Sequence, residues 1–202
     1  MESLIIPFGI TSISGLSNLS NLISVIIPNS VTSIRGFSFT GLTSITIPNS
    51  VTTINDSFNY CENLTSITIP NSVTTIDGFN SCTSLTSITL PNSVTTISGF
   101  SSCTGLTSIT IPNSVTTISG FSNCTGLTSI TIPNSITTIG EGCFTNCTNL
   151  TAITILCETP PNVRPSAFGG TTSNCPIYVP ANSVDLYKST LPDFADRIQA
   201  IP

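Results

Sequence analysis

LTSITIPNSVTTISGFSNCTG, residues 106–126, is the stretch that decides the fold. The copy before it, residues 85–105, differs only at Leu90 and Ser102. Further copies recur along the whole chain at steps of 20 to 23 residues, opening at Met1, Leu22, Leu42, Leu64, Leu85, Leu106, Leu127 and Leu150. Self-similarity at a period of this size predicts a solenoid, in which each unit buries its apolar face by stacking on its neighbours.

The apolar residues within one copy predict two short strands. Residues 106–111 have the pattern L-x-x-I-x-I, whose alternation of Ile with Ser and Thr is typical of a strand with one buried face. Pro112-Asn113-Ser114 then indicates a turn, and residues 115–118 are β-branched throughout, which favours a second strand. The remaining bend has room for an irregular or 3₁₀ turn and not for a full α-helix.

Two columns of side chains are expected to fill the interior. Phe79, Phe100 and Phe121 recur at one position and should stack in a buried column. A second position carries Cys61, Cys82, Cys103, Cys124 and Cys147, and in the first two copies Leu19 and Thr40. A site that accepts Leu, Thr or Cys is interpreted as a packing site, at which free Cys acts as a small hydrophobe. Cys157 and Cys175 lie outside this column and are left as either free thiols or a pair.

At this point the residues resemble a known family. The core L-x-x-I-x-I-P-x-S-V-x-x-I, closed by F-x-x-C, is similar to the BspA-like leucine-rich-repeat surface proteins. The copy at residues 127–149 has the family's 23-residue length, and residues 175–202 resemble the segment that ends many such chains. The resemblance implies a mainly β, right-handed leucine-rich-repeat solenoid with parallel sheets, short turns or 3₁₀ segments, and a small C-terminal α/β cap.

We therefore expect a solenoid over residues 1–156, with seven repeats and the strand of an eighth, and a capping segment over residues 157–202. In the cap, residues 176–180 favour a strand, and a short helix should carry Val184, Tyr187 and Leu191 on one face. Seven of the thirteen charged residues lie in the last 45 positions. A charged, proline-rich end is what a terminal unit needs to stop further stacking.

Composition excludes several classes of function. Only 6% of residues are charged, and the net charge is −5 with four basic residues, which argues against nucleic acid and anionic membrane surfaces as partners. No apolar run approaches the length needed for membrane insertion. The start MESLIIPFGI lacks the basic region of a signal peptide, so we expect a fragment of a longer exported chain or another route, such as a virion protein.

The sequence offers no set of catalytic residues. It contains no His, the commonest general base and metal ligand, and no close C-x-x-C pair. Asp56 and Asp77 follow the second strand of adjacent copies and are interpreted as turn residues rather than a catalytic pair. We therefore predict a protein that is not an enzyme and that uses no cofactor or metal.

What repeats on the outer surface is an array of hydroxyl groups. Stacked rungs lie about 4.8 Å apart, so Ser and Thr at the third and fifth positions of each copy should form rows. These residues are the candidate binding face: Ser44, Thr46, Ser66, Thr68, Ser87, Thr89, Ser108, Thr110, Ser129 and Thr131. Solenoids commonly present such extended faces to partners.

Three hypotheses follow for function. The first is an adhesin-like module, extracellular or on the cell surface, which binds a protein or glycan on another cell or host matrix. The second is a structural component of a phage or viral particle or an extracellular assembly. The third, which curvature of the sheet would disfavour, is ice binding.

The first two copies differ at the fifth strand position. Ile5 and Ile26 replace the hydroxyl residue there and should point outward. Because exposed apolar patches on soluble proteins usually mark contacts, they form a candidate association patch. We expect self-association, or contact with an upstream domain, through residues 1–40.

Overall fold

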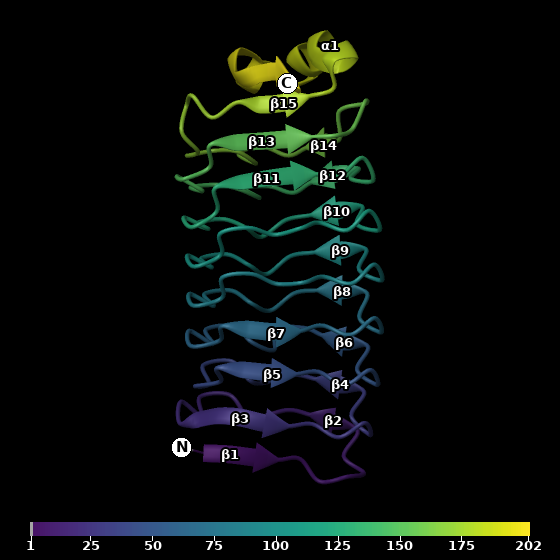
Figure 1. Cartoon of the computed structure of the whole chain (residues 1–202), viewed down its shortest axis with the longest axis vertical. Coiled ribbons are helices and arrows are strands. Elements are labelled where there is room, and N and C mark those ends of the chain that lie inside the picture. Colours follow the sequence, from purple (N-terminus) through teal and green to yellow (C-terminus); the bar gives the residue numbers. More distant parts are fainter. Residues whose placement is uncertain (1) are drawn as a thin grey trace.

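The structure is a computed structural model that describes residues 2–202. It is a stack of coils in which each sequence copy forms one rung, so the predicted mainly β solenoid is confirmed. The rungs rise from the N-terminal end to a small helical segment at the C-terminal end (Figure 1). Each rung places its L-x-x-I-x-I residues on one face, the first-strand face, and its V-T-T-I residues on another, the second-strand face.

The first-strand face consists of three separate parallel sheets. Their strands pair in the order β1-β3, β5-β7 and β11-β13-β15-β16. The register sets equivalent residues of successive copies side by side, as in the pairs Ser44–Ser66 and Thr46–Thr68. The strands that the repeats contribute are β1 (Glu2–Ile5), β3 (Leu22–Ile26), β5 (Ser44–Thr46), β7 (Ser66–Thr68), β11 (Ser129–Ile132) and β13 (Ala152–Ile155).

The prediction of a regular first strand is wrong in two copies. In the copies at Leu85 and Leu106, only an isolated bridge from Thr68 to Thr89 remains. Amide–carbonyl bonds between these rungs are also longer, 3.2 Å from Thr107 to Thr86 against 2.9 Å from Thr65 to Thr43. Residues 106–111 have the same letters as the strand-forming residues 127–132, so the break follows from rung spacing and not from local propensity.

The second-strand face is one continuous parallel sheet of eight strands. Each strand has only two residues, so each rung contributes little pairing and the sheet depends on repetition. A glycine ends several of these strands: at Gly78, φ is +109° and an added Cβ would lie 2.6 Å from the Asp56 amide nitrogen. The strands are β2 (Ser12–Ile13), β4 (Ser33–Ile34), β6 (Thr53–Ile54), β8 (Thr75–Ile76), β9 (Thr96–Ile97), β10 (Thr117–Ile118), β12 (Thr138–Ile139) and β14 (Asn162–Val163).

A column of phenylalanine rings runs through the core. Successive rings are nearly parallel, with centroids between 5.2 and 6.0 Å apart, which confirms the predicted column. All its members are buried, and the column extends beyond the three predicted rings. Its members are Phe37, Phe58, Phe79, Phe100, Phe121, Phe144 and Phe168. Offset parallel stacking of this kind adds to the burial of large apolar area.

The cysteine column lies beside the phenylalanine column, as predicted. In the first copy the prediction of a packing site is wrong, because Leu19 is 43% exposed at the end of the stack. All thiols of the column are buried and free. Each thiol donates to the carbonyl oxygen of the phenylalanine in the preceding rung, at sulfur–oxygen distances of 3.0 to 3.2 Å. The column therefore links adjacent rungs as well as filling space.

The C-terminal segment continues the coil and then covers it. β15 (Ile177–Val179) and β16 (Ile198–Ala200) extend the first-strand face, and between them lie η1 (Ala181–Ser183), α1 (Val184–Thr190) and η2 (Pro192–Arg197). Tyr187 of α1 is fully buried, and its hydroxyl donates to the Cys157 carbonyl oxygen at 2.8 Å. This confirms a short helix with an apolar face.

The same segment ends the aromatic column. Phe194 meets Phe168 edge to face at 5.4 Å, and the Arg197 guanidinium lies 5.8 Å from the Phe194 ring. Arg197 also donates from Nε to the Cys175 carbonyl oxygen at 2.8 Å. Because the Phe194 ring is nearly perpendicular to the Phe168 ring and lies near the Arg197 guanidinium, it offers no face on which another Phe could continue the parallel stack. Cys157 and Cys175 are both free thiols.

Candidate functional site

The ten residues of the candidate binding face all lie exposed on the first-strand face. Each alternates with a buried Ile or Leu, so the predicted strand phase is correct even in the two copies without regular strands. Within residues 2–202, none of the ten hydroxyls takes part in a hydrogen bond. They are therefore free to bond to water or to a ligand.

The threonines of the second-strand face differ in this respect. Thr95, Thr116 and Thr137 each donate a hydroxyl to the threonine carbonyl of the preceding rung, at 3.4, 3.5 and 3.1 Å. These hydroxyls therefore help to hold adjacent rungs together and are less available to a ligand. The two faces have similar composition, but on the second-strand face one threonine row is bonded between rungs. The other row, which includes Thr96 and Thr117, forms no side-chain hydrogen bond within residues 2–202 and is mostly half-buried, whereas both rows of the binding face are exposed.

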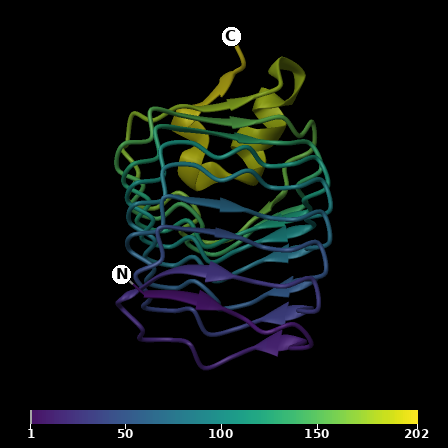
Figure 2. The same ribbon diagram turned by 60° about the horizontal axis from the view of Figure 1, so that its bottom comes forward.

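Ile5 and Ile26 of the candidate association patch lie side by side and point outward. They are direct partners in the β1–β3 ladder and are 67% and 58% exposed. Phe8, in the turn after β1, is 87% exposed. β1 is the edge strand of its sheet, since it pairs with β3 alone, and Figure 2 brings this end of the stack forward. The outward direction of both isoleucines is confirmed; their role in association stays a prediction.

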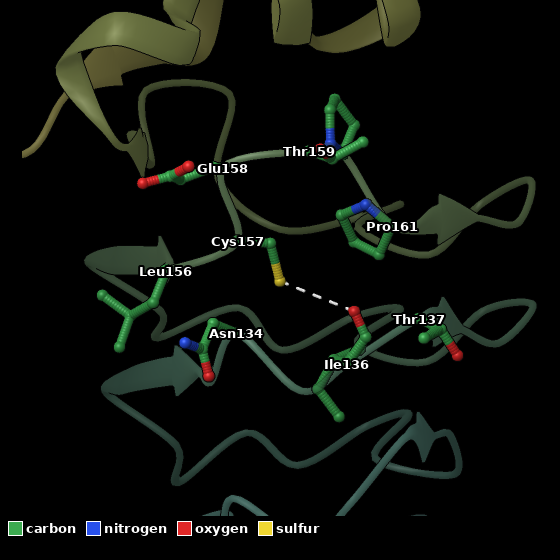
Figure 3. Close-up of a pocket in the computed structure, with 9 residues that line it drawn as sticks. Asn134, Ile136, Thr137, Leu156, Cys157, Glu158, Thr159 and Pro161 are labelled. Atoms are coloured by element: carbon green, nitrogen blue, oxygen red, sulfur yellow. Dashed lines mark hydrogen bonds between the residues drawn. The ribbon is translucent and has the colours of Figure 1, made fainter.

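A pocket of about 520 Å³ lies where the coil meets the cap. Figure 3 shows Asn134, Ile136 and Thr137 on one side, and Leu156 to Pro161 on the other, with the Cys157 sulfur directed inward. The Cys157 thiol donates to the carbonyl oxygens of Pro133 and Ile136, at 3.3 and 3.5 Å. Burial raises the pKa of this thiol. It therefore remains protonated and is a poor nucleophile.

The cysteines of the buried column are equally unsuited to thiolate chemistry. Burial raises the pKa of Cys103 to about 12 and that of Cys147 to about 11. The pKa values of the remaining column thiols are raised for the same reason. A thiol held neutral at physiological pH and bonded to a carbonyl oxygen serves structure and not catalysis.

Asp56 and Asp77 are close enough for their charges to interact. Partial burial raises the pKa of the Asp77 carboxyl, and the neighbouring Asp56 charge raises it further, against the Gly78 amide and the Ser98 hydroxyl, which lower it. Asp56 has φ +48° and accepts a 3.2 Å bond from Asn59 Nδ2. A left-handed backbone and a local side-chain bond are turn features, which supports the turn interpretation of Asp56.

Over residues 2–202 there is no group of three or more His, Cys, Asp or Glu side chains placed to hold a metal ion. In the same part of the chain, no helix has the length and apolar character needed to span a bilayer.

Sequence reasoning missed one pair of surface residues, Phe39 and Tyr60. They stand at the position before the cysteine column, where later copies carry Ser81, Ser102 and Asn123. Both rings are exposed and stack on each other, with centroids 4.4 Å apart. The available signal was this departure from the repeat: two adjacent aromatics at a position otherwise occupied by small polar residues.

The comparisons with known proteins agree on the architecture. The BspA type leucine rich repeat region is matched in six copies, over residues 14–120 and 77–193. No curated protein matches the sequence. Among solved structures, a leucine-rich repeat protein from Bacteroides ovatus is 26% identical with a TM-score of 0.65, over 88% of this chain and 55% of its own length.

Two more solved structures share the coil. A leucine rich cell surface protein from Faecalibacterium prausnitzii is 30% identical with a TM-score of 0.57, over 89% of this chain and 60% of its own. The leucine rich repeat protein of T. pallidum is 21% identical with a TM-score of 0.57, over 99% of this chain and 86% of its own, and supports the fold alone. This chain thus spans 55% and 60% of the first two proteins. Since the family match covers most of the sequence, the chain belongs to the BspA-type leucine-rich-repeat family.

Proposed function

We propose that this protein is a non-catalytic, adhesin-like interaction module that binds a protein or glycan ligand through the candidate binding face. The observation that carries the proposal is that both hydroxyl rows of this face are exposed and form no hydrogen bond within the described chain. The ten hydroxyls of the binding face have no partner within residues 2–202, whereas Thr95, Thr116 and Thr137 of the other face are committed to carbonyl oxygens. Regular, uncommitted donors and acceptors on an extended surface suit a ligand that is itself extended.

Charge supports the same assignment. No charged residue occurs between Asp77 and Glu141, so the middle of this face would bind by hydrogen bonds and shape and not by ion pairs. Such binding depends little on salt, because charge screening has nothing to act on.

Display outside the cell is part of the proposal. The F. prausnitzii relative is described as a cell surface protein. We place the protein on a cell surface or among secreted proteins.

The test compares two matched surface variants. Thr89→Arg with Thr110→Arg places two charges on the binding face, and Thr95→Arg with Thr116→Arg places two on the second-strand face. Binding of the parent to immobilised matrix proteins, cell-surface glycans and whole cells is measured first. We expect the first variant to lose binding at least tenfold and the second to keep it. Equal effects of both variants, or no binding of the parent to any surface, would contradict the proposal.

A second candidate, a structural component of a particle or extracellular assembly, rests on the association patch. Exposed Ile5, Ile26 and Phe8 form an apolar surface at one end of the stack. For ice binding, the interruption of regular strand pairing in the copies at Leu85 and Leu106 is unfavourable, because a lattice match needs evenly spaced rows.

A further inference from the structure

Phe39 and Tyr60 form an exposed aromatic stack that the fold does not require. Their rings are parallel to within 6°, and their 4.4 Å centroid separation is shorter than any in the buried column. Yet the two residues are 48% and 44% exposed. An aromatic pair in the core would stabilise by burial, but this pair leaves nearly half its area in water.

The backbone at this position is unfavourable for large side chains. Phe39 and Tyr60 have φ of +59° and +60°, as do the small residues that replace them elsewhere, such as Ser81 at +61° and Asn123 at +59°. The conformation is set by the coil, because the amide here donates to the next rung, at 2.9 Å from Phe39 to Asn59 and 2.7 Å from Tyr60 to Asn80. A left-handed conformation is a genuine outlier for a bulky residue. Strain of this kind concentrates at functional sites.

The stack borders a shallow pocket of about 290 Å³. Besides the two rings, it is lined by Ser20, Thr40, Gly41, Glu62 and Asn63. The Thr40 hydroxyl is committed to the Phe37 carbonyl oxygen at 2.7 Å. The side chains of Ser20, Glu62 and Asn63 form no hydrogen bond within the described chain, and Glu62 is the only charged residue of the lining. The pocket therefore combines aromatic carbon with uncommitted polar groups, and it disfavours anionic ligands.

We propose that this aromatic pocket binds a neutral saccharide. A pyranose ring has an apolar C–H face that packs on an aromatic ring, and a rim of hydroxyls that donate to a carboxylate and an amide oxygen. Each ring of the stack has one face against the other and its second face away from it. The volume lies just below the usual range of about 300–1,000 Å³ for ligand pockets, which suits one or two sugar rings.

A proline-rich peptide is the competing ligand, since such peptides dock on aromatic grooves. The stack spans only two rungs, about 4.8 Å apart. One turn of a polyproline helix extends about 9 Å, so the stack is too short for two successive turns of such a peptide. The sugar therefore fits the observed geometry better. The site lies in the bend before the first strand, apart from the candidate binding face, and does not rest on the proposed function of that face.

The experiment starts from an array of neutral mono- to tetrasaccharides, probed with the intact chain. A hit is followed by calorimetry and by tyrosine fluorescence, to which Tyr60, Tyr178 and Tyr187 contribute because the chain has no Trp. Only a fluorescence change that is lost when Tyr60 is replaced reports on this site. Phe39→Ser with Tyr60→Ser removes the stack and installs the residue that Ser81 and Ser102 carry at the same position, so the coil should be retained. We expect at least a tenfold loss of affinity in this variant and in Glu62→Gln.

The matched control is the Thr89→Arg, Thr110→Arg variant, which alters the binding face and should keep saccharide binding. The melting temperature of the serine variant checks that it is folded. Three results would overturn the proposal: no saccharide bound by the parent, unchanged affinity in a folded serine variant, or quenching of tyrosine fluorescence by a proline-rich peptide and by no saccharide. Because the control variant disables the face of the proposed function, failure of one site is distinguishable from failure of the other.

Discussion

The Cys103 thiol donates to the Phe79 carbonyl oxygen of the preceding rung, at a distance of 3.0 Å. The same oxygen accepts the Cys82 amide at 3.2 Å, so a single carbonyl receives bonds from two rungs. Where the position holds threonine, as at Thr40 and Thr171, the hydroxyl donates to the phenylalanine carbonyl of its own rung, at 2.7 Å in both cases. The cysteine column is therefore a buried polar ladder within an apolar core.

Alkaline pH should weaken the fold through this ladder. Burial raises the pKa of Cys103 from 9.0 to about 12, so the folded chain keeps a proton that the unfolded chain releases. The stabilisation is complete below pH 9 and is lost as pH rises from 9 toward 12. At pH 10 this one thiol should lower the unfolding free energy by roughly 1 kcal/mol. Denaturant unfolding at pH 7.5 and pH 10 measures the loss, and Cys103→Ala should lose correspondingly less. An equal decline in both proteins would show that Cys103 is not the source.

The thiols of the column should be protected from alkylation in the native state. Cys61, Cys82, Cys103, Cys124 and Cys147 are fully buried and should react with iodoacetamide only after unfolding. Parallel Cβ directions in stacked rungs disfavour the dihedral angle of a disulfide, so no cross-links are expected. Mass spectrometry with and without denaturant counts the modified residues. Native labelling of the column, or intact cross-links within it, would contradict this prediction.

Truncation of one ring in the aromatic column should be costly. Phe100 is fully buried between Phe79 and Phe121, with centroids at 5.3 and 5.2 Å. Phe100→Ala should lower the unfolding free energy by roughly 3–5 kcal/mol, as expected for a buried aromatic. Phe39→Ala is the matched control on the surface and should cost far less. A loss below about 1 kcal/mol for Phe100→Ala would mean that the ring is not part of the core.

Self-association through the N-terminal surface should depend on the two outward-pointing isoleucines, Ile5 and Ile26. Ile5→Thr with Ile26→Thr installs the residue that later copies carry at the same strand position, and should leave the fold intact while weakening self-association at least tenfold. Sedimentation over a range of concentrations measures the change. A double variant that associates like the parent, or a parent that stays monomeric at high concentration, would refute this role.

The repeat pattern was sufficient to predict the interior and the orientation of the surface. Ile109 and Ile111 point inward and Ser108 and Thr110 point outward because an extended chain alternates with period two, even in this copy, which forms no regular strand. The stacking of Phe79, Phe100 and Phe121 follows from equal positions in equal coils. The end of the column at Phe194 did not follow, because an edge-to-face contact depends on how the terminal helices pack.

Properties that depend on the contacts between neighbouring rungs could not be predicted from the sequence. Residues 106–111 and 127–132 have one sequence, yet only the second forms a regular strand. The hydroxyls of Thr110 and Thr116 are chemically equivalent, but only that of Thr116 finds a carbonyl within bonding distance. Such differences depend on the contacts between neighbouring rungs, which no single copy encodes.

The in-register columns also bear on how the length of this protein can change. Phe79, Phe100 and Phe121 occupy equivalent positions in successive copies. Deleting residues 85–105 would therefore bring Phe79 next to Phe121, at the spacing that now separates neighbouring rings. The two cut ends, Ser84 and Leu106, belong to copies that already share a register. Unequal recombination between the DNA segments that encode these near-identical copies would thus delete or duplicate whole coils without opening the core. A lineage carrying this gene has a route to longer or shorter forms in single genetic steps, with both chain ends preserved.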